Sequence, residues 1–313
     1  MRLRLGTRGS RLALAQARAV EEKLRAGDPS LQVEIVEIHT SGDSIQDVPL
    51  GPSLGQAFFT KEIEDALLAG RVDLAVHSCK DLATTLPPGL CIAAVPERED
   101  PRDALVGPTG GLRALRPGAR VGTSSPRRKR FLSALRPDLE VADMRGNVPT
   151  RVAAVDEGRF DAALLAVAGL RRLGLEGRVS EVLDPDLVLP AAGQGALAVE
   201  AREEDARVRE ALAVIENAPA RSAVTAERAC LRRLGAGCQA PVGALAETTA
   251  GALRLRAAVA LRDRIHRVDL SGSNADAEAL GTAAAEALLA RTGLPTLRGI
   301  VWAPEASAKA SAP

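Results

Sequence analysis

Apolar and polar positions repeat one plan in two parts of the chain. Near the start, an apolar strand at residues 3–5 leads into a glycine-containing loop at residues 6–10 and a helical pattern over residues 12–24. The same order returns at residues 119–135. An apolar run followed by a 3.6-residue period is typical of a strand that leads into an amphipathic helix. The repeat therefore predicts two units of the same architecture.

Both units continue with further strands. A second strand is predicted at residues 33–38 of the first unit and at residues 139–142 of the second. Each unit then has a helix that ends at a glycine, followed by an apolar strand at residues 74–77 or 162–166. Such near-continuous apolar runs are typical of strands buried on both faces of a parallel sheet. We therefore predict two similar α/β lobes whose polar loops bind a ligand beyond the carboxyl ends of the strands.

The pattern changes after about residue 218. A helix over residues 220–234 is followed by alternating strands at residues 253–261 and 265–270 and by a helix over residues 275–289. Helices and strands are segregated here, which predicts a small α+β domain. The Ala-, Ser- and Pro-rich end of the chain is predicted to be disordered.

Composition narrows the functional classes. The 313 residues carry 41 basic and 40 acidic side chains, and only 2% of residues are aromatic. Balanced charge and few stacking side chains disfavour binding of nucleic acid. The longest apolar run is too short to span a bilayer, and arginines interrupt the first apolar stretch, so we expect a cytoplasmic protein with no membrane partner. Four cysteines without a CxxC pair and three scattered histidines predict no metal site.

Positive charge is concentrated in residues 122–151, although the formal net charge is only +1. Ser125 and Pro126 predict a helix N-cap and first helical position. Arg127 and Arg128 then lie in the first turn, where each cation costs about 0.3–1 kcal/mol. We therefore expect the side chains of Arg127 and Arg128 to be unpaired cations that bind an anionic ligand.

Several arginines lie at predicted strand ends. Any single one is more often an ordinary surface residue, but together they favour a ligand with several carboxylates or phosphates, because a guanidinium binds such groups through paired hydrogen bonds. The candidates are Arg8, Arg11, Arg127, Arg128, Arg145, Arg151 and Arg172.

Asp81 and Cys238 are the candidate reactive groups. Asp81 follows Lys80 directly after a buried strand, and it is either half of a solvated ion pair or a general acid/base that also stabilises a cation. Cys238 lies in a glycine-flanked loop, and it is either a small buried thiol or a nucleophile and covalent anchor. Cys79, Cys91 and Cys230 are interpreted as packing residues, and His77 as a structural histidine.

The chain resembles the porphobilinogen deaminase family, also called hydroxymethylbilane synthase. The resemblance rests on segments that follow one another over most of the chain. They include TRGSRLALAQA at residues 7–17, VHSCKDL at 76–82, PEREDPRDAL at 96–105, GTSSPRR at 122–128, RGNVPTR at 145–151, LPAAGQGALAVE at 189–200 and TAERACLRRLGAGCQAPVGA at 225–244.

The resemblance implies an activity and a cofactor. The family condenses four porphobilinogen molecules head to tail with loss of ammonia and then releases linear hydroxymethylbilane by hydrolysis. The chain grows on a dipyrromethane cofactor, and motif matching places its thioether attachment at Cys238. Asp81 falls on the catalytic aspartate, which would assist loss of the aminomethyl nitrogen and stabilise the resulting cation. A chain growing on the enzyme carries many carboxylates, which makes phosphate the less favoured ligand.

The resemblance also assigns site residues. Positions that would contact the cofactor are Cys238, Lys80, Ser78, Asp81, Thr123, Ser124, Ser125, Arg127, Arg128, Arg145 and Gly146. Positions that would contact the substrate are Arg8, Ser10, Phe59, Arg127, Arg151, Arg172 and Gln194. Pro52 and Gln56 stand where many bacterial members have lysines, and Pro126 replaces a usual leucine.

The predicted fold class is α/β, with two similar periplasmic-binding-protein-like lobes that contain mixed, parallel-rich sheets and a small α+β C-terminal domain. The expected division is residues 1–97 with 195–216 for the first lobe, 98–194 for the second, 217–303 for the cysteine-bearing domain and 304–313 for a disordered tail. A monomer is expected by resemblance. The alternative function is a two-lobed protein that binds a small anion without catalysis, for which neither Asp81 nor Cys238 would be needed.

Overall fold

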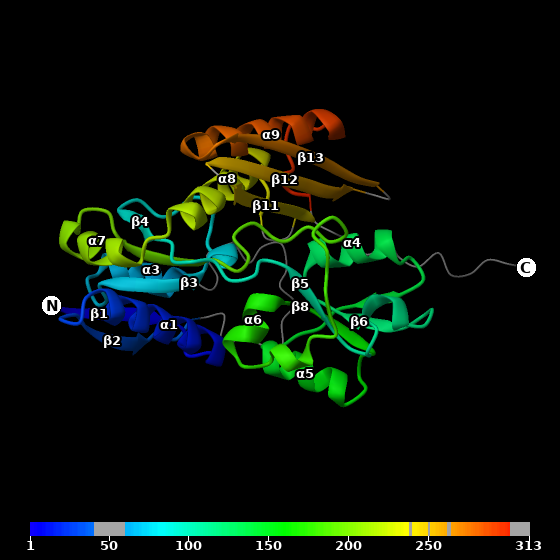
Figure 1. Ribbon diagram of the computed structural model, residues 1–313, viewed down its shortest axis with the longest axis horizontal. Coiled ribbons are helices and arrows are strands. Elements are labelled where there is room, and N and C mark those ends of the chain that lie inside the picture. Colours follow the sequence, from blue (N-terminus) through cyan, green and yellow to red (C-terminus); the bar gives the residue numbers. More distant parts are fainter. Residues whose placement is uncertain (41–59, 238–239, 250, 262–263, 301–313) are drawn as a thin grey trace, which may run out of the picture.

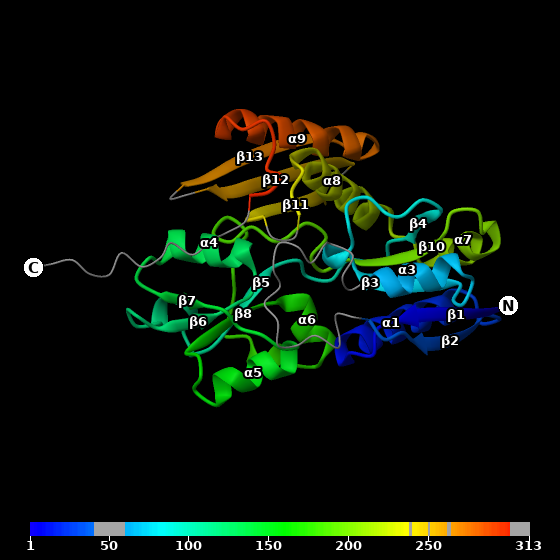
Figure 2. The ribbon, with the colours of Figure 1, turned by 180° about the vertical axis from the view of Figure 1, so that it is seen from behind.

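The computed structural model describes residues 1–40, 60–237, 240–249, 251–261 and 264–300. This part of the chain forms two five-stranded sheets and one three-stranded sheet. We call the regions around them lobe 1 (strands β1–β4 and β10), lobe 2 (strands β5–β9) and the C-terminal domain (strands β11–β13). Figure 1 shows lobe 1 and lobe 2 side by side with the C-terminal domain above them, and Figure 2 shows the same arrangement from behind.

Lobe 1 has the strand order β2-β1-β3-β10-β4. β1 runs parallel to β2 and β3, whereas β10 runs antiparallel to β3 and β4. Its helices cover the sheet and bury leucine and valine side chains against it. The elements are β1 (Arg2–Thr7), α1 (Arg11–Gly27), β2 (Gln32–Glu37), α3 (Lys61–Leu68), β3 (Leu74–Ser78), β4 (Leu90–Ala94), β10 (Leu197–Arg202) and α7 (Ala206–Leu212).

Lobe 2 repeats this topology with the order β7-β6-β8-β5-β9. β6 is parallel to β7 and β8, and β5 is antiparallel to β8 and β9. The internal repeat in the sequence therefore reflects two lobes with the same strand order. The elements are β5 (Asp103–Val106), β6 (Arg120–Gly122), α4 (Pro126–Leu135), β7 (Glu140–Ala142), α5 (Val148–Asp156), β8 (Ala162–Ala166), α6 (Val167–Arg172) and β9 (Glu181–Val182).

The antiparallel strands that complete both sheets were not predicted. The chain leaves lobe 1 after β4, builds lobe 2 and returns to lobe 1 at β10. The two crossing segments contact each other, because the Glu99 amide donates to the Gly195 carbonyl at 3.3 Å. Gly195 has a φ of +86°, and an added Cβ would collide with the Glu99 carbonyl, so this crossing needs glycine.

The C-terminal domain is an antiparallel sheet, β11-β12-β13, covered by two helices (Figure 1). Its elements are α8 (Ala218–Leu234), β11 (Val242–Thr249), β12 (Ala252–Leu261), β13 (Arg264–Ser273) and α9 (Ala277–Thr292). The sequence predicted both helices and two strands but missed β11. Together with the two lobes, this domain confirms the predicted fold class.

Several predictions fall outside the described residues. These concern Phe59, Cys238, Pro52, Gln56 and the tail at residues 304–313. In the described part of the chain, no helix is both long and apolar enough to cross a membrane. Likewise, no group of three or more His, Cys, Asp or Glu side chains there is arranged to hold a metal ion.

Candidate active site

The α4 helix begins as the sequence predicted. Ser125 is its N-cap, with its hydroxyl accepting a hydrogen bond from the Arg128 amide at 3.4 Å, and Pro126 is at the start of the helix. The buried Thr123 hydroxyl accepts a bond from the Ser125 amide at 3.2 Å. These bonds fix the turn between β6 and α4, so the first-turn arginines project from a defined backbone.

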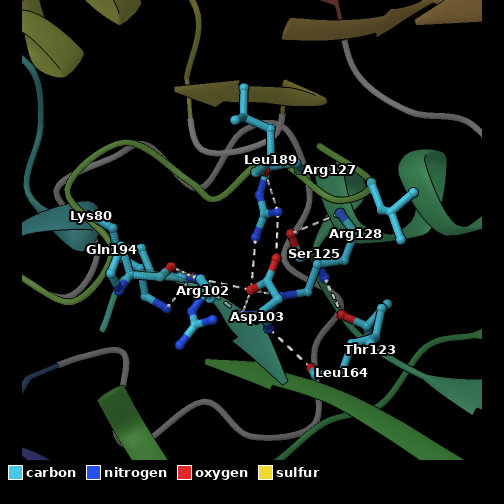
Figure 3. Close-up of polar contacts among 12 residues, drawn as sticks. Lys80, Arg102, Asp103, Thr123, Ser125, Arg127, Arg128, Leu164, Leu189 and Gln194 are labelled. Carbon is cyan, nitrogen blue, oxygen red and sulfur yellow. Dashed lines mark hydrogen bonds and ion pairs between the residues drawn. The ribbon is translucent and has the colours of Figure 1, made fainter. Parts of the chain in front are cut away.

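The expectation that Arg127 and Arg128 are unpaired is wrong. Both side chains are buried, and both donate hydrogen bonds to the fully buried carboxylate of Asp103 (Figure 3). Arg127 Nη1 lies 2.6 Å from Asp103 Oδ2, and Arg128 Nη2 lies 2.7 Å from Asp103 Oδ1. The physical reason is the fold, because antiparallel pairing brings the first residue of β5 beside the start of α4. The helix-dipole penalty is thus offset by a buried counter-ion instead of an external anion.

Asp103 is held in its ionised form. Burial by itself raises the pKa of the carboxyl group, but the charges and hydrogen bonds of Arg127 and Arg128 outweigh burial and hold that pKa well below its usual range. One carboxylate faces two guanidinium groups, so the cluster keeps an excess positive charge. Nε of Arg127 is buried and has no hydrogen-bond partner among the described residues.

Gln194 joins this cluster to the end of β3. Its amide nitrogen donates to Asp103 Oδ1 at 2.8 Å and to the Pro101 carbonyl at 2.7 Å. Its oxygen accepts from Arg128 at 3.3 Å and from Lys80 Nζ at 3.4 Å. Figure 3 shows Gln194 between Lys80 and Asp103. The predicted substrate contact of Gln194 stays a prediction, since its side chain is 1% exposed and bonded to protein groups.

Ser78, Lys80 and Asp81 lie at the carboxyl end of β3. Residues Cys79–Asp81 form a short 3₁₀ helix there, and the Ser78 hydroxyl accepts a bond from Gln16 of α1 at 2.8 Å. The pKa of Lys80 is lowered to about 8, chiefly by burial. The positive charges of Arg128 and Arg127 also lower it, whereas the negative charges of Asp81 and Asp103 raise it. The Asp81 side chain is exposed, and no described residue forms a hydrogen bond or ion pair with it.

Arg145 and Arg151 add two further cations to this region. Arg151 donates to the Gly146 carbonyl at 2.8 Å and to the Ser124 hydroxyl at 3.1 Å. No ion pair of either arginine is found in the described part of the chain. Burial, together with the charges of Arg128 and Arg145, lowers the pKa of Arg151 to about 10. A cation that lies near other cations is stabilised when an anion binds beside it.

The remaining predicted arginines lie nearer lobe 1. Arg172, at the end of α6, donates to the Gly195 carbonyl at 2.7 Å, and burial lowers its pKa. Arg8 is partly exposed in the loop before α1, and Arg11 is exposed in the first turn of that helix. Ser10 is the N-cap of α1 and accepts a bond from the Ala13 amide at 3.2 Å.

A hollow separates the Lys80 segment from the segment that leads to Cys238. Its walls include Cys79, Lys80, Arg228 and Gly237. Lys80, on the wall of this hollow, also belongs to a cationic cluster with Arg128, Arg145 and Arg151, for which Asp103 is the buried counter-ion, and such a cluster fits an anionic organic group. A dipyrromethane substituted with carboxylates matches that charge.

The comparisons with known proteins agree with this chemistry. A family model described as "Porphobilinogen deaminase, dipyromethane cofactor binding domain" matches residues 3–210, and one described as "Porphobilinogen deaminase, C-terminal domain" matches residues 222–290. The chain belongs to the porphobilinogen deaminase family. The porphobilinogen deaminase of Roseiflexus sp. (strain RS-1) is 50% identical over 94% of this chain and 98% of its own length. That of Syntrophobacter fumaroxidans is 50% identical over 89% of this chain and 91% of its own length.

The methionine binding protein MetQ aligns with a TM-score of 0.44 at 12% identity, over 68% of this chain and 89% of that one. The family match does not favour the alternative of an anion-binding protein without catalysis.

Sequence reasoning missed four charged residues of this porphobilinogen deaminase family member. Asp103 was one. Arg98 forms a buried ion pair with Glu227 at 2.7 Å, and the neighbouring Arg228 reaches the loop after Asp81. Each lies inside a segment that carried the resemblance, but only Asp103 had a local signal, a charged residue at the start of an apolar run. His77, which we interpreted as a structural histidine, is buried, with Nε2 3.1 Å from Glu200 Oε2.

Proposed function

We propose that this member of the porphobilinogen deaminase family is a hydroxymethylbilane synthase, a transferase of tetrapyrrole biosynthesis. It joins four porphobilinogen molecules with loss of ammonia and then releases linear hydroxymethylbilane. Family membership supports the reaction and the dipyrromethane cofactor. The main structural support for assigning this reaction to particular residues is the cationic cluster of Lys80, Arg128, Arg145 and Arg151 near Asp81.

The charges of the cluster lie near enough to one another to interact electrostatically. Lys80 interacts with Asp81 and Arg128, and Arg151 interacts with Arg128 and Arg145. Apart from Asp103, no carboxylate is hydrogen-bonded to these cations in the described residues. The acetate and propionate groups of a pyrrole would each gain charge-assisted hydrogen bonds worth about 1.5–3 kcal/mol.

Lys80, Ser78 and the segment around Ser124 and Arg145 would hold the dipyrromethane. When bound, this group supplies the pyrrole carbon to which the first substrate is joined. Arg145 and Arg151 bind carboxylates and exclude competing orientations. Asp103 keeps Arg127 and Arg128 in place, so these guanidinium groups need little rearrangement when a carboxylate arrives.

Asp81 would carry the proton and charge chemistry. Its carboxylate is exposed at the end of a buried strand, so its position is fixed while its oxygens stay accessible. A carboxylate there stabilises the positive charge that develops on the substrate as ammonia leaves. It can also take the proton that the pyrrole carbon loses after the new bond forms.

The thioether bond to Cys238 is part of this proposal. Gly237, the residue before this cysteine, lines the same hollow as Lys80, which supports attachment near the cluster. The domain boundaries predicted from the sequence are supported by the pairing of β10 with lobe 1. Monomeric state, a cytoplasmic location and the absence of nucleic-acid or membrane partners stay predictions.

Intact mass spectrometry combined with an Ehrlich-type pyrrole colour test examines the proposal. The purified wild-type protein is expected to carry the extra mass of one dipyrromethane and to give the colour. Cys238→Ser should lose both, whereas Cys91→Ser, a matched change in lobe 1, should keep both. A folded wild-type protein without extra mass or colour would contradict the proposed function.

A further inference from the structure

Two consecutive residues of α8 connect the C-terminal domain to the rest of the molecule. Glu227 is fully buried and accepts hydrogen bonds from Arg98 and from the Gly193 and Ala246 amides at 2.6–2.7 Å. These bonds tie α8 to both segments that cross between the lobes and to β11. Glu227 therefore fixes the position of α8. This position also sets the direction in which the side chain of the next residue, Arg228, leaves the helix.

Arg228 reaches a different segment. Its Nη2 donates to the Ala83 carbonyl at 2.6 Å, and its Nη1 donates to the Leu82 carbonyl at 3.5 Å. Leu82 and Ala83 follow Asp81 directly in the chain. The Arg228 side chain is 9% exposed and forms no ion pair with a described carboxylate. Both of these hydrogen bonds are thus directed to the backbone that follows Asp81.

Arg228 also lines the hollow described above. Cys79 and Lys80 of lobe 1 line this hollow together with Ala236 and Gly237 of the C-terminal domain. Arg228 therefore lies where the Asp81 segment of lobe 1 meets the cysteine-bearing loop of the C-terminal domain. In Figure 2, α8 lies between the three-stranded sheet and the end of lobe 1 nearest that sheet.

We propose that Arg228 is a positioning residue for Asp81. Through its hydrogen bonds to the Leu82 and Ala83 carbonyls, it holds the Asp81 segment in a fixed position relative to the cysteine-bearing domain. The inference rests on the proposed function. A planar guanidinium can bond two neighbouring carbonyls at once in a fixed geometry, whereas the single ammonium of a lysine leaves the segment free to shift. A displacement of about 1 Å at a reacting group can lower a rate by about 100-fold.

Arg221 offers a matched control on the same helix. Its Nη1 donates to the Ile92 carbonyl of lobe 1 at 3.0 Å, and it pairs with Glu216 at 2.7 Å. It also ties α8 to lobe 1 through a backbone carbonyl, but it does not line the hollow and does not contact the Asp81 segment. If Arg228 only helped to hold α8 against lobe 1, substitution of either arginine should therefore have a similar effect on activity.

The experiment compares the Arg228→Lys and Arg221→Lys holoenzymes with the wild type. For Arg228→Lys, we expect the dipyrromethane mass to be present, KM to change little and kcat to fall about 10- to 100-fold. Amide hydrogen exchange at residues 80–85 should be faster in Arg228→Lys than in the wild type. For Arg221→Lys, kcat and exchange at residues 80–85 should match the wild type even where the Tm falls.

Each other outcome is decisive. Either a wild-type kcat or unchanged exchange at residues 80–85 in Arg228→Lys would overturn the inference, as would equal losses of kcat in both variants. If neither Arg228→Lys nor Arg228→Gln folds, Arg228 is a structural residue and the inference is wrong. A wild-type protein without cofactor mass or turnover would instead contradict the proposed function, so the two failures are distinguishable.

Discussion

Asp103 and Arg127 form a buried ion pair in which Oδ2 of the carboxylate lies 2.6 Å from Nη1 of the guanidinium. Neither side chain is more than a few per cent exposed. The pair explains how a helix can begin with two arginines. The carboxylate compensates part of their charge inside the protein, and one of the two positive charges remains in excess.

Loss of this counter-ion should destabilise the protein. Asp103→Asn leaves two buried guanidinium groups facing a neutral amide, and breaking a buried ion pair typically costs about 3–5 kcal/mol. We expect a lower midpoint of urea unfolding than in the wild type. Asp100→Asn, which alters a more exposed ion pair with Arg102, is the control and should cost much less. Equal losses in the two variants would contradict a special role for Asp103.

The same pair predicts how stability depends on acid. The pKa of Asp103 is lower in the folded protein than its unfolded value of about 3.9, so its contribution is complete above that pH and is lost as the pH falls below it. The Tm of the wild type should therefore fall on acidification below about pH 4. Asp103→Asn should lack this part of the decrease, which differential scanning calorimetry at several pH values can measure.

Lys80 predicts a change in activity on the alkaline side. Because its pKa is lowered to about 8, its positive charge is lost as the pH rises through that value. We expect kcat/KM for the anionic substrate to fall above about pH 8, since one cation of the cluster is then neutral. Lys80→Arg should keep its charge and move this decrease to higher pH. An identical alkaline profile in that variant would assign the titration to another group.

Arg145 and Arg128 should respond differently to substitution. Arg145 is exposed and has no carboxylate partner in the described residues, so Arg145→Gln should weaken substrate binding or stall chain growth with little change in Tm. Arg128 is buried against Asp103, so Arg128→Gln should lower the Tm as well. Steady-state kinetics and thermal unfolding of both variants measure these effects. Equal destabilisation by both changes would show that Arg145 has a structural partner.

Asp81→Asn should nearly abolish turnover while the fold is kept. The amide cannot accept a proton or stabilise a cation as the carboxylate does, and loss of a positioned acid/base group typically lowers a rate about 100- to 10,000-fold. Asp65→Asn, an exposed change on α3, is a control for the loss of one negative charge. Single-turnover release of ammonia measures the effect, and a rate near the wild-type value would remove Asp81 from its proposed role.

Local sequence patterns predicted much of the fold. The strand-loop-helix repeat identified the parallel part of both sheets, and the N-cap at Ser125 was confirmed with its proline. The antiparallel strands β4, β5, β9 and β10 were not predicted. Strands of two to six residues have little periodicity of their own, and their pairing partners lie far away in the sequence.

For the site, the sequence by itself identified the concentration of arginines, the Lys80–Asp81 pair at a strand end and the segments that carry the family resemblance. Residue types, short spacings and order along the chain are sufficient for these, because each signal is local. Only the tertiary structure decided that Asp103 is the counter-ion of Arg127 and Arg128, and that Arg228 reaches the segment after Asp81. Asp103 lies 24 residues before Arg127, and Arg228 lies 145 residues after Ala83. Which charges meet in a buried site depends on how strands and domains pack, and no local pattern specifies that.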